Sequence, residues 1–475
     1  MGKQYDVVIV GSGPNGLSAG IVLAAKGLQV LIIEGAETVG GGTRTSELTL
    51  PGYYHDVCSA VHPMGYLSPY FKTLPLEEFG LEWIIPKASA AHPLDNQEAV
   101  LLSKSISETA HNLGIDAEKY QKIVTPFVDQ AEDLLSDSLK PLGIPSNPLL
   151  LMQFGLKALQ PATFYSKHAF EGERAKALFA GCAAHSVLPF DKFFTTAIGL
   201  MFLVTGHVEN WAIPKGGSQN IANALAAYFK SLGGELKPST KITDYKQLPD
   251  AKKYMFDTDP IQLAHIAKDQ LPPSYQARLN KYQFGPGVFK IDYALDAPIP
   301  WKDPRCLDAS TVHVGGTFAE VAASEKDAWE GRECQRPFVM LSQQSQFDTS
   351  RAPEGKHTGW AYCHVPNGSN KDMTQAIESQ IERFAPGFKD TILAKRTMTT
   401  QDFYQYNPNY LGGAITGGAA DIFQLFTRPV ARIDPYSTPN PDIYICSASS
   451  PPGGGVHGMC GYHAAQSVLK SLKIR

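Results

Sequence analysis

The chain lacks several features that mark specialised classes of protein. Its 475 residues include only seven cysteines, none of them spaced as CxxC, so neither a disulfide framework nor a metal site is expected. It has no run of Lys or Arg and a formal net charge of −4, which argues against a nucleic-acid partner. It also has no stretch of about 20 uncharged apolar residues, so no membrane-spanning helix is expected.

What is present is the composition of an ordinary folded protein, with 43% hydrophobic and 19% charged residues. The length favours two domains. The first strand-like run begins at Tyr5 and leaves no room for a signal peptide, and the scattered cysteines favour a reducing compartment. We therefore expect a cytoplasmic location.

The N-terminal segment has the pattern of a βαβ unit. Tyr5–Val10 (YDVVIV) and Gln29–Glu34 (QVLIIE) are short apolar runs typical of buried parallel strands, and a helix-like run ending near Lys26 separates them. Glu34 ends the second strand, where a carboxylate can accept hydrogen bonds from ribose hydroxyls.

The segment Gly11–Gly16 (GSGPNG) follows the first strand and matches GxGxxG. Gly11 would permit the tight turn, Gly13 would let a pyrophosphate approach the backbone, and Gly16 would let the helix pack on the strand. The helix N-terminus would then face the diphosphate with unpaired N–H groups. The combination predicts a bound dinucleotide but does not separate NAD from FAD.

Two further glycine-rich turns favour FAD. Gly40–Thr45 (GGGTRT) follows the second strand and contains Arg44, which could reach a phosphate or could be a solvated side chain on a plain surface turn. Gly453–Gly458 (GGGVHG) follows the strand-like run Asp442–Ser447, but the segment after it is too short for a second βαβ unit. We interpret it as a loop against which a flat ring system can lie, leading into a helix whose positive end faces the flavin. This interpretation requires the two ends of the chain to meet.

Together these segments resemble the phytoene desaturase-related branch of the FAD-dependent oxidoreductases. The matching sequences extend over essentially the whole chain and include LTLPGYYHDVCSAVHPM, AHPLD, WAIPKGGSQ, FGPGVFKIDYAL, GKHTGWAYCHVPNGS, NPNYLGGAITGG and CSASSPPGGGVHGMCGYHAA. The resemblance implies FAD in a glutathione-reductase-type fold, with a hydrophobic substrate that reaches the flavin.

The resemblance also implies which residues form the cofactor site. The family FAD site would comprise Gly11, Ser12, Gly13, Pro14, Asn15, Gly16, Glu34, Gly35, Gly41, Gly42, Thr43, Arg44, Ile242, Ser449, Gly454, Gly455, Val456, His457 and Gly458. Ile242, at the end of a strand, would lie beside the adenine, and the residues from Ser449 onward would line the flavin side.

The expected fold class is α/β: a Rossmann FAD domain of the glutathione-reductase type with an inserted α+β substrate domain, an antiparallel sheet plus helices. The stretch from Lys87 to Gly206 is expected to be helical, with apolar residues at helical spacing over Glu108–Leu135 and Pro148–Leu159. Aromatic, alternating segments between Tyr282 and Tyr410 suggest the antiparallel sheet. The predicted domains are residues 1–86, 211–280 and 425–475 for FAD, and 87–210 and 281–424 for the substrate.

His457 is the candidate catalytic side chain, since an imidazole beside the flavin could shuttle a proton. The alternative is a packed histidine that shapes its loop. His185 and His207 are interpreted as core histidines. The candidate substrate-lining residues are Cys58, His62, Trp211, Asn409 and Tyr410. The apolar stretch Asn147–Tyr165 is expected to be buried in the substrate domain, with a peripheral membrane-dipping face as the alternative.

The favoured function is abstraction of hydride by FAD from a C–H bond of a hydrophobic, polyene- or isoprenoid-like small molecule. An external acceptor (a quinone, O2 or another oxidant) would reoxidise the flavin. Alternatives on the same fold are a flavin-dependent amine oxidase, a flavin-dependent isomerase and a non-catalytic lipid- or prenyl-binding protein. The last of these would not need the intact GSGPNG and Glu34 that this chain keeps.

Overall fold

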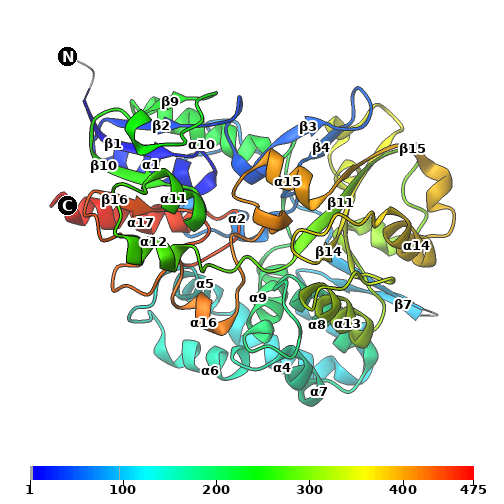
Figure 1. Cartoon of the computed structure of the whole chain (residues 1–475). Helices are drawn as coiled ribbons and strands as arrows, with labels where there is room; N and C mark the ends of the chain where they lie inside the picture. The colour runs from blue at the N-terminus through cyan, green and yellow to red at the C-terminus, as the bar shows by residue number, and fades with distance from the viewer. Residues whose placement is uncertain (1–3, 96, 475) are drawn as a thin grey trace.

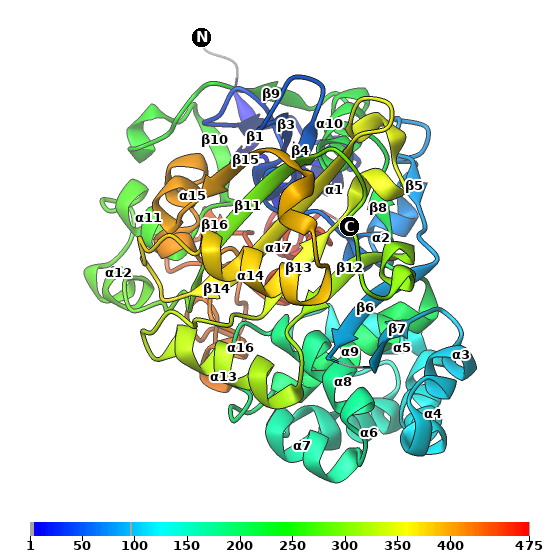
Figure 2. The ribbon, with the colours of Figure 1, turned by 90° about the vertical axis from the view of Figure 1, so that its right-hand side faces the viewer.

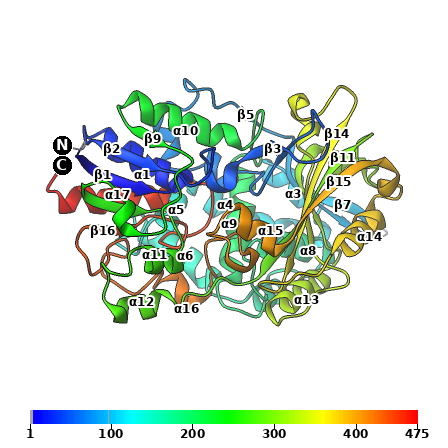
Figure 3. The same ribbon diagram turned by 45° about the horizontal axis from the view of Figure 1, so that its top comes forward.

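Two sheets organise the chain, and they lie side by side (Figures 1 and 3). The computed structural model describes residues 4–95 and 97–474. The first sheet has five parallel strands in the order β16-β10-β1-β2-β9. Its strands are β1 (Tyr5–Val10), β2 (Val30–Ile33), β9 (Glu235–Lys237), β10 (Ala251–Phe256) and β16 (Ile443–Ile445).

The strands of this sheet are apolar along both faces because helices cover each face. Val7 and Ile9 of β1 pack in the cluster that contains α1, α10 and α17, whereas Val8 and Val10 pack in the cluster that contains α11 and α12. The helices are α1 (Pro14–Ala24), α10 (Gln219–Ser231), α11 (Pro260–Ile266), α12 (Pro273–Leu279) and α17 (Met459–Ser471). The predicted strand–loop–helix–strand order of the N-terminal segment is confirmed.

The two ends of the chain meet, as the sequence interpretation required. The C-terminal strand β16 joins the same sheet as β1, and α17 lies against α1 (Figure 1). A Cβ on Gly461 of α17 would collide with the carbonyl oxygen of Asn15 in α1. Glycine at this position therefore allows the two helices to touch.

The second sheet has seven strands in the order β15-β11-β14-β13-β12-β6-β7, antiparallel except for the β12–β6 pair. Its strands are β6 (Ala88–Leu94), β7 (Gln97–Leu102), β11 (Gly287–Leu295), β12 (Ala309–Val314), β13 (Val339–Ser342), β14 (His357–Val365) and β15 (Ile392–Met398). The expectation that helices begin at Lys87 was therefore wrong. The run Ala88–Leu94 forms an antiparallel hairpin with β7 and also pairs in parallel with β12, far along the chain, and no local pattern reveals the second pairing.

Helices cover the second sheet on both faces. Helix α14 (Thr374–Phe384) lies in front of it in Figure 2, with Ile377 and Ile381 packed against the strands. The other face meets a group of helices that includes α8 and α9. The remaining helices are α2 (Pro63–Tyr66), α3 (Ile106–His111), α4 (Ala117–Val128), α5 (Ala131–Ser138), α6 (Pro148–Ala158), α7 (Ala162–Ala169), α8 (Glu173–Ala184), α9 (Thr195–Val208), α13 (Phe318–Trp329), α15 (Thr400–Tyr406) and α16 (Ile422–Leu425).

The segment Asn147–Tyr165 is only partly buried. On α6, Leu149, Met152 and Leu156 are exposed, while Leu150 and Phe154 are buried. The expectation that this segment is buried was therefore wrong for half of the helix.

Two small pairings complete the fold. The hairpin β3 (Thr45–Glu47) with β4 (Tyr54–Asp56) follows the second glycine turn, and β5 (Trp83–Ile84) pairs with β8 (Ile213–Pro214). The five-stranded sheet draws its strands from residues within 1–86, 211–280 and 425–475. The division into an FAD domain and a substrate domain at those bounds stays a prediction.

Candidate functional site

One cavity of about 670 Å³ runs from the carboxyl edge of the five-stranded sheet to the seven-stranded sheet. Residues from both ends of the chain line it, among them Gly13 and Gly41 from the N-terminal part and Gly454 from the C-terminal loop. Its volume is within the range of about 300–1,000 Å³ that is typical of small-molecule sites.

The polar end of the cavity is built on the GxGxxG turn. Gly11 has φ +100°, a left-handed conformation that favours glycine, and its N–H donates to the carbonyl of Ile33 at 2.8 Å. A Cβ on Gly16 would collide with the carbonyl oxygen of Gly11, so α1 can begin this close to the strand only with glycine there. Helix α1 has no side-chain cap at Gly13, which leaves its positive N-terminal end facing the cavity.

Glu34 lies at the end of β2 and is held by the turn beside it. Its Oε2 accepts from the Ser12 N–H at 2.9 Å and from the Ser12 hydroxyl at 2.6 Å, and its Oε1 accepts from the Ala36 N–H at 2.9 Å. Arg44 Nη2 lies 3.4 Å from the same carboxylate and donates to the carbonyl of Thr38 at 2.8 Å. Arg44 is buried, so the alternative of a solvated side chain on a plain surface turn was wrong.

A carboxyl group that the sequence interpretation missed lies at the same helix end. Asp257 follows β10, and its Oδ2 accepts from the Gly16 N–H at 3.0 Å. Burial raises the pKa of Asp257 from 3.8 to about 7. A neutral carboxyl group here would not repel an anionic ligand, whereas an ionised one would.

Five polar atoms of cavity-lining residues lack a hydrogen-bond partner among the described residues, namely Asn15 Oδ1, Ser186 Oγ, Thr258 Oγ1, Trp360 Nε1 and Arg428 Nε. Arg428 is 2% exposed, and among the described residues its guanidinium donates only to the carbonyls of Ala419 (3.1 Å) and Ala448 (3.4 Å). No described carboxylate forms an ion pair with it. An unpaired buried charge is costly, so this arginine calls for an anionic partner in the cavity. A dinucleotide diphosphate fits that requirement.

The other end of the cavity is apolar and aromatic. On β14 the side chains alternate: Trp360 and Tyr362 line the cavity, whereas Ala361 packs on the α14 side of the sheet. Phe202 of α9 and Trp211 complete the lining, with ring centroids 5.3 Å apart.

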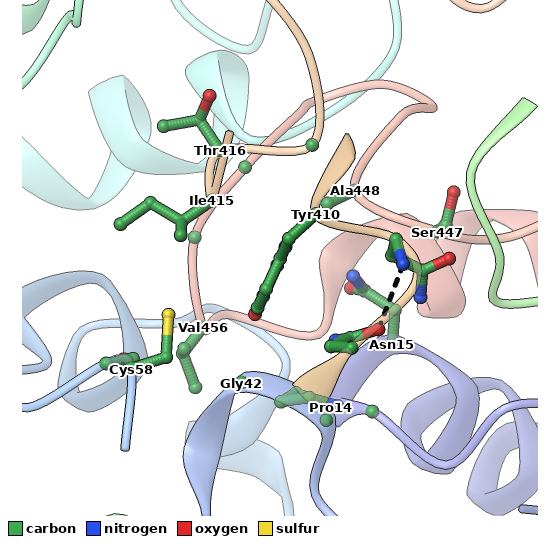
Figure 4. A pocket seen from close by; sticks show the side chains of 18 of the residues that line it. Pro14, Asn15, Gly42, Cys58, Tyr410, Ile415, Thr416, Ser447, Ala448 and Val456 are labelled. Carbon is green, nitrogen blue, oxygen red and sulfur yellow. Dashed lines mark hydrogen bonds between the residues drawn. The ribbon is translucent and has the colours of Figure 1, made fainter. Parts of the chain in front are cut away.

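Between the two ends lies a group of side chains shown in Figure 4, in which the hydroxyl of Tyr410 points toward Gly42 and Cys58. A Cβ on Gly42 would collide with that hydroxyl. Burial raises the pKa of the Cys58 thiol to about 11, so it stays protonated near neutral pH. The Tyr406 hydroxyl donates to the carbonyl of Gly41 at 2.6 Å.

Most residues predicted for the site line this cavity. The predicted cofactor residues on its wall are Gly11, Ser12, Gly13, Pro14, Asn15, Glu34, Gly35, Gly41, Gly42, Thr43, Arg44, Ile242, Ser449, Gly454, Gly455 and Val456. All five predicted substrate-lining residues (Cys58, His62, Trp211, Asn409 and Tyr410) are also on the wall. Ile242 belongs to a loop rather than to a strand, because β9 ends at Lys237.

Three predicted residues do not line the cavity, namely Gly16, Gly458 and the candidate catalytic residue His457. His457 is buried, and its Nδ1 accepts from the backbone N–H of Met459 at 3.0 Å, the first residue of α17. Burial lowers its pKa to about 4. This geometry matches the alternative of a histidine that shapes its loop, and it does not support a proton shuttle on the cavity wall.

Of three histidines near the apolar end, two line the cavity and one lies in the core. His62 lines the cavity, with Nε2 2.8 Å from the Ser218 hydroxyl, and burial lowers its pKa to about 4. His185, interpreted as a core residue, also lines the cavity and stacks on Phe202 at 4.1 Å. His207 lies in the core, where it hydrogen-bonds to the Tyr120 hydroxyl at 2.6 Å.

Some residues that the sequence interpretation missed follow a recognisable local pattern, and others do not. Asp257 and Asp259 directly follow a parallel strand in the segment DTDP. Because ligands of α/β sheets bind beyond the carboxyl ends of the strands, this position indicates a site residue. Arg428 is a single arginine in a loop, and no local pattern indicates that it is buried. Among the described residues no group of His, Cys, Asp and Glu could hold a metal ion. None of the described helices is long and apolar enough to cross a membrane.

A known family model matches the N-terminal segment of the chain. Residues 9–74 match the NAD(P)-binding Rossmann-like domain. The segment includes the glycine turn, Glu34 and Arg44, so the Rossmann-like βαβ unit inferred from the sequence is confirmed.

Along its whole length the chain is similar to oxidoreductases. Pyridine nucleotide-disulfide oxidoreductase domain-containing protein 2 from Rattus norvegicus is 25% identical over 99% of this chain and 94% of that protein. A limonene dehydrogenase polypeptide from Castellaniella defragrans is 23% identical over 99% and 95%. Phytoene desaturase (lycopene-forming) from Pantoea ananas is 22% identical over 97% and 98%. The resemblance stated from the sequence is confirmed.

Solved structures share the fold. An oxidoreductase from Methanosarcina mazei has a TM-score of 0.68 at 14% identity, covering 98% of this chain and all of that one. Putrescine oxidase bound to putrescine has a TM-score of 0.62 at 16% identity, covering both chains fully. At these identities the likeness shows the arrangement of a Rossmann-like domain with mixed α/β sheets and nothing about the reaction.

Proposed function

We propose that this protein is an FAD-dependent oxidoreductase that removes hydride from a C–H bond of a neutral, hydrophobic small molecule. The proposal rests on one observation: a single continuous cavity has a polar, charged end and an aromatic end. One end has a helix N-terminus, Glu34 and an unpaired buried arginine, and the other end has aromatic walls. A long cofactor with an anionic diphosphate and a flat ring fits such a cavity better than a compact polar ligand does.

The polar end supplies what the nucleotide half of FAD needs. The N-terminal end of α1 and Arg428 would face the diphosphate, and Glu34 would accept from the ribose. With its pKa raised to about 7 by burial, Asp257 would be partly protonated near neutral pH, and neighbouring phosphates would favour its neutral form further. The loop Gly453–Gly458, without bulky side chains over most of its length, would lie along the ring system.

The flavin, when bound, would supply the two-electron chemistry. The residues of the chain would orient the substrate and exclude water from it. Phe202, Trp360 and Tyr362 offer flat apolar surfaces, and the Cys58 thiol stays protonated and uncharged. An external oxidant, such as a quinone or O2, would complete the cycle.

The lack of a described carboxylate at the aromatic end favours a neutral substrate over an amine. Every acidic residue on the cavity wall, Glu34, Asp257 and Asp259, belongs to the polar end. A cationic amine at that end would have no carboxylate partner among the described residues, so only the faces of the aromatic rings would offset the loss of its hydration. Relatives named limonene dehydrogenase and phytoene desaturase support the same choice.

The test is to purify the protein gently, record its visible absorbance and identify co-purified small molecules by mass spectrometry. We expect the absorbance of an oxidised flavin and a mass equal to FAD. Anaerobic mixing with candidate isoprenoids should then bleach the flavin permanently, because no acceptor is present. Transient bleaching would point to an isomerase. A colourless protein that carries lipid would contradict the proposal and indicate a lipid-binding protein.

A further inference from the structure

The aromatic end of the cavity contains a histidine with one unpaired ring nitrogen. His185 directly follows α8, lines the cavity and stacks on Phe202 of the neighbouring helix α9, with ring centroids 4.1 Å apart. Its Nε2 lies 3.0 Å from Nε2 of His313 on β12, whereas its Nδ1 has no hydrogen-bond partner among the described residues. This second nitrogen is therefore available to a molecule in the cavity.

His313 holds the ring of His185 from behind. It is fully buried against α8, where a Cβ on Gly181 would lie only 2.3 Å from its Nδ1. Since a neutral imidazole carries one N–H, one of the two facing Nε2 atoms donates and the other accepts. If His185 donates to His313, its Nδ1 is a lone pair that can accept from a hydroxyl group. If His313 donates, Nδ1 of His185 carries the proton and can donate to a carbonyl group.

The charge at this end favours a neutral ligand group over a carboxylate. Burial lowers the pKa of His185 to about 3, so its ring is uncharged near neutral pH. The cations on the described cavity wall, Arg44, Lys241 and Arg428, belong to the polar end. An alcohol or a ketone would need no counter-charge beside His185, whereas a carboxylate would.

Further polar groups at the same end are unpaired. Ser186 Oγ and Trp360 Nε1 are buried without a hydrogen-bond partner among the described residues. Thr311 lines the cavity from β12, 3% exposed, and its hydroxyl forms no hydrogen bond within the described chain. Val187, also on the wall, has φ +53°, which a β-branched residue rarely adopts. Buried polar groups are normally paired, so this set on an aromatic wall indicates a ligand that carries a polar group.

We propose that the aromatic end of the cavity binds a hydroxyl or carbonyl group of an otherwise hydrophobic molecule, with His185 as its hydrogen-bond partner and Thr311 beside it. The inference deepens the proposed function, on which it rests for the fate of the bound molecule. It narrows the substrate class to hydrophobic alcohols and ketones. A pure hydrocarbon would fill the aromatic walls but would leave these polar groups unpaired.

Competition binding with matched ligands tests the assignment. One set is p-menthane, menthol and menthone, which share a carbon skeleton, and the other is dodecane, dodecanol and dodecanoate. Each ligand displaces Nile red from the purified protein at neutral pH, and the fluorescence gives its dissociation constant. In His185→Phe, which keeps a ring on Phe202 but cannot hydrogen-bond, the affinity for menthol relative to p-menthane should fall about threefold to about tenfold. The affinity for p-menthane itself should not fall.

Two further variants separate the hydrogen bond from damage to the fold. Thr311→Val keeps the side-chain volume and removes only a hydroxyl, so it should also lower the relative affinity for menthol. The matched control is His168→Phe, because His168 also packs on a phenylalanine, Phe164, at 4.2 Å but is exposed on α7. This control should bind every ligand as wild type does.

An unchanged relative affinity in both cavity variants would overturn the proposal. So would tightest binding by dodecanoate within its set, or a wild-type protein that binds no member of either set. Displacement requires no turnover, so the result is independent of the proposed reaction. A flavin-free protein that prefers menthol would contradict only the proposed function, whereas a flavoprotein without that preference would contradict only this inference.

Discussion

Replacement of Arg428 by methionine tests whether the cavity holds an anionic cofactor. Arg428 is buried on the cavity wall, donates to two backbone carbonyls at 3.1 and 3.4 Å, and forms no ion pair within the part of the chain that the structure describes. Methionine keeps much of the volume and removes the charge. The variant Arg428→Met should therefore bind FAD more weakly, while the flavin-free protein should lose little stability, because an unpaired buried charge is also removed.

The magnitude follows from the type of contact. Hydrogen bonds to charged groups contribute about 1.5–3 kcal/mol, which corresponds to a loss of about tenfold to about a hundredfold in affinity. The dissociation constant is measured by titrating flavin-free protein with FAD and following the flavin fluorescence, and thermal unfolding of the same samples reports stability.

The matched control is Arg432→Met. Arg432 is four residues further along and exposed, and it donates to the Ser437 hydroxyl and the Thr438 carbonyl, each at 3.2 Å. It should leave the FAD affinity unchanged. If Arg428→Met binds FAD as tightly as wild type but unfolds at a lower temperature, the arginine only holds its loops together and the reasoning is refuted.

Three further predictions concern the walls of the cavity. Gly13→Val should give a folded protein without visible flavin absorbance after purification. The valine side chain would fill the turn, where a Cβ would already lie 2.7 Å from Asp257 Oδ2. A variant that retains flavin would show that the site lies elsewhere. Asp257 has its pKa raised from 3.8 to about 7 in the fold, so its contribution to stability is complete below pH 3.8 and is lost as pH rises through about 7. Flavin-free Asp257→Asn should therefore gain stability over wild type at pH 8 but not at pH 4 in denaturant unfolding, and an equal difference at both pH values would be a failure. His457→Ala should lower the free energy of unfolding by about 1 kcal/mol through loss of the hydrogen bond from the Met459 N–H, with flavin content retained; a fall of several orders of magnitude in flavin reduction by substrate would instead make His457 part of the chemistry.

Local spacing determined the polar end of the cavity. The turn Gly11–Gly16, Glu34 and Arg44 are separated by a single strand–helix–strand unit, so their positions follow from backbone geometry over a short stretch of chain. The C-terminal glycine loop lies at the same cavity because β16 joins the same sheet and α17 packs against α1.

The aromatic half was only partly predictable. Trp360 and Tyr362 are on the cavity side because β14 alternates, but which side faces the cavity is set by the packing of α14 on the opposite face of the sheet. The position of His457 off the cavity wall was not predicted, because sequence order places it within the C-terminal glycine loop that lines the cavity. The left-handed turn at Gly458 and the start of α17 direct its ring into the core instead.

The sequence by itself therefore determined the α/β class, the N-terminal Rossmann-like βαβ unit and the meeting of the two chain ends, since each rests on short-range patterns of glycine and apolar residues. Only the tertiary structure decided that Arg428 and Asp257 face the same cavity, that β6 joins a sheet instead of a helical region, and that half of α6 stays exposed. Those outcomes depend on contacts between segments far apart in the chain. Burial and charge pairing stabilise these contacts, and neither produces a periodic pattern in the local sequence.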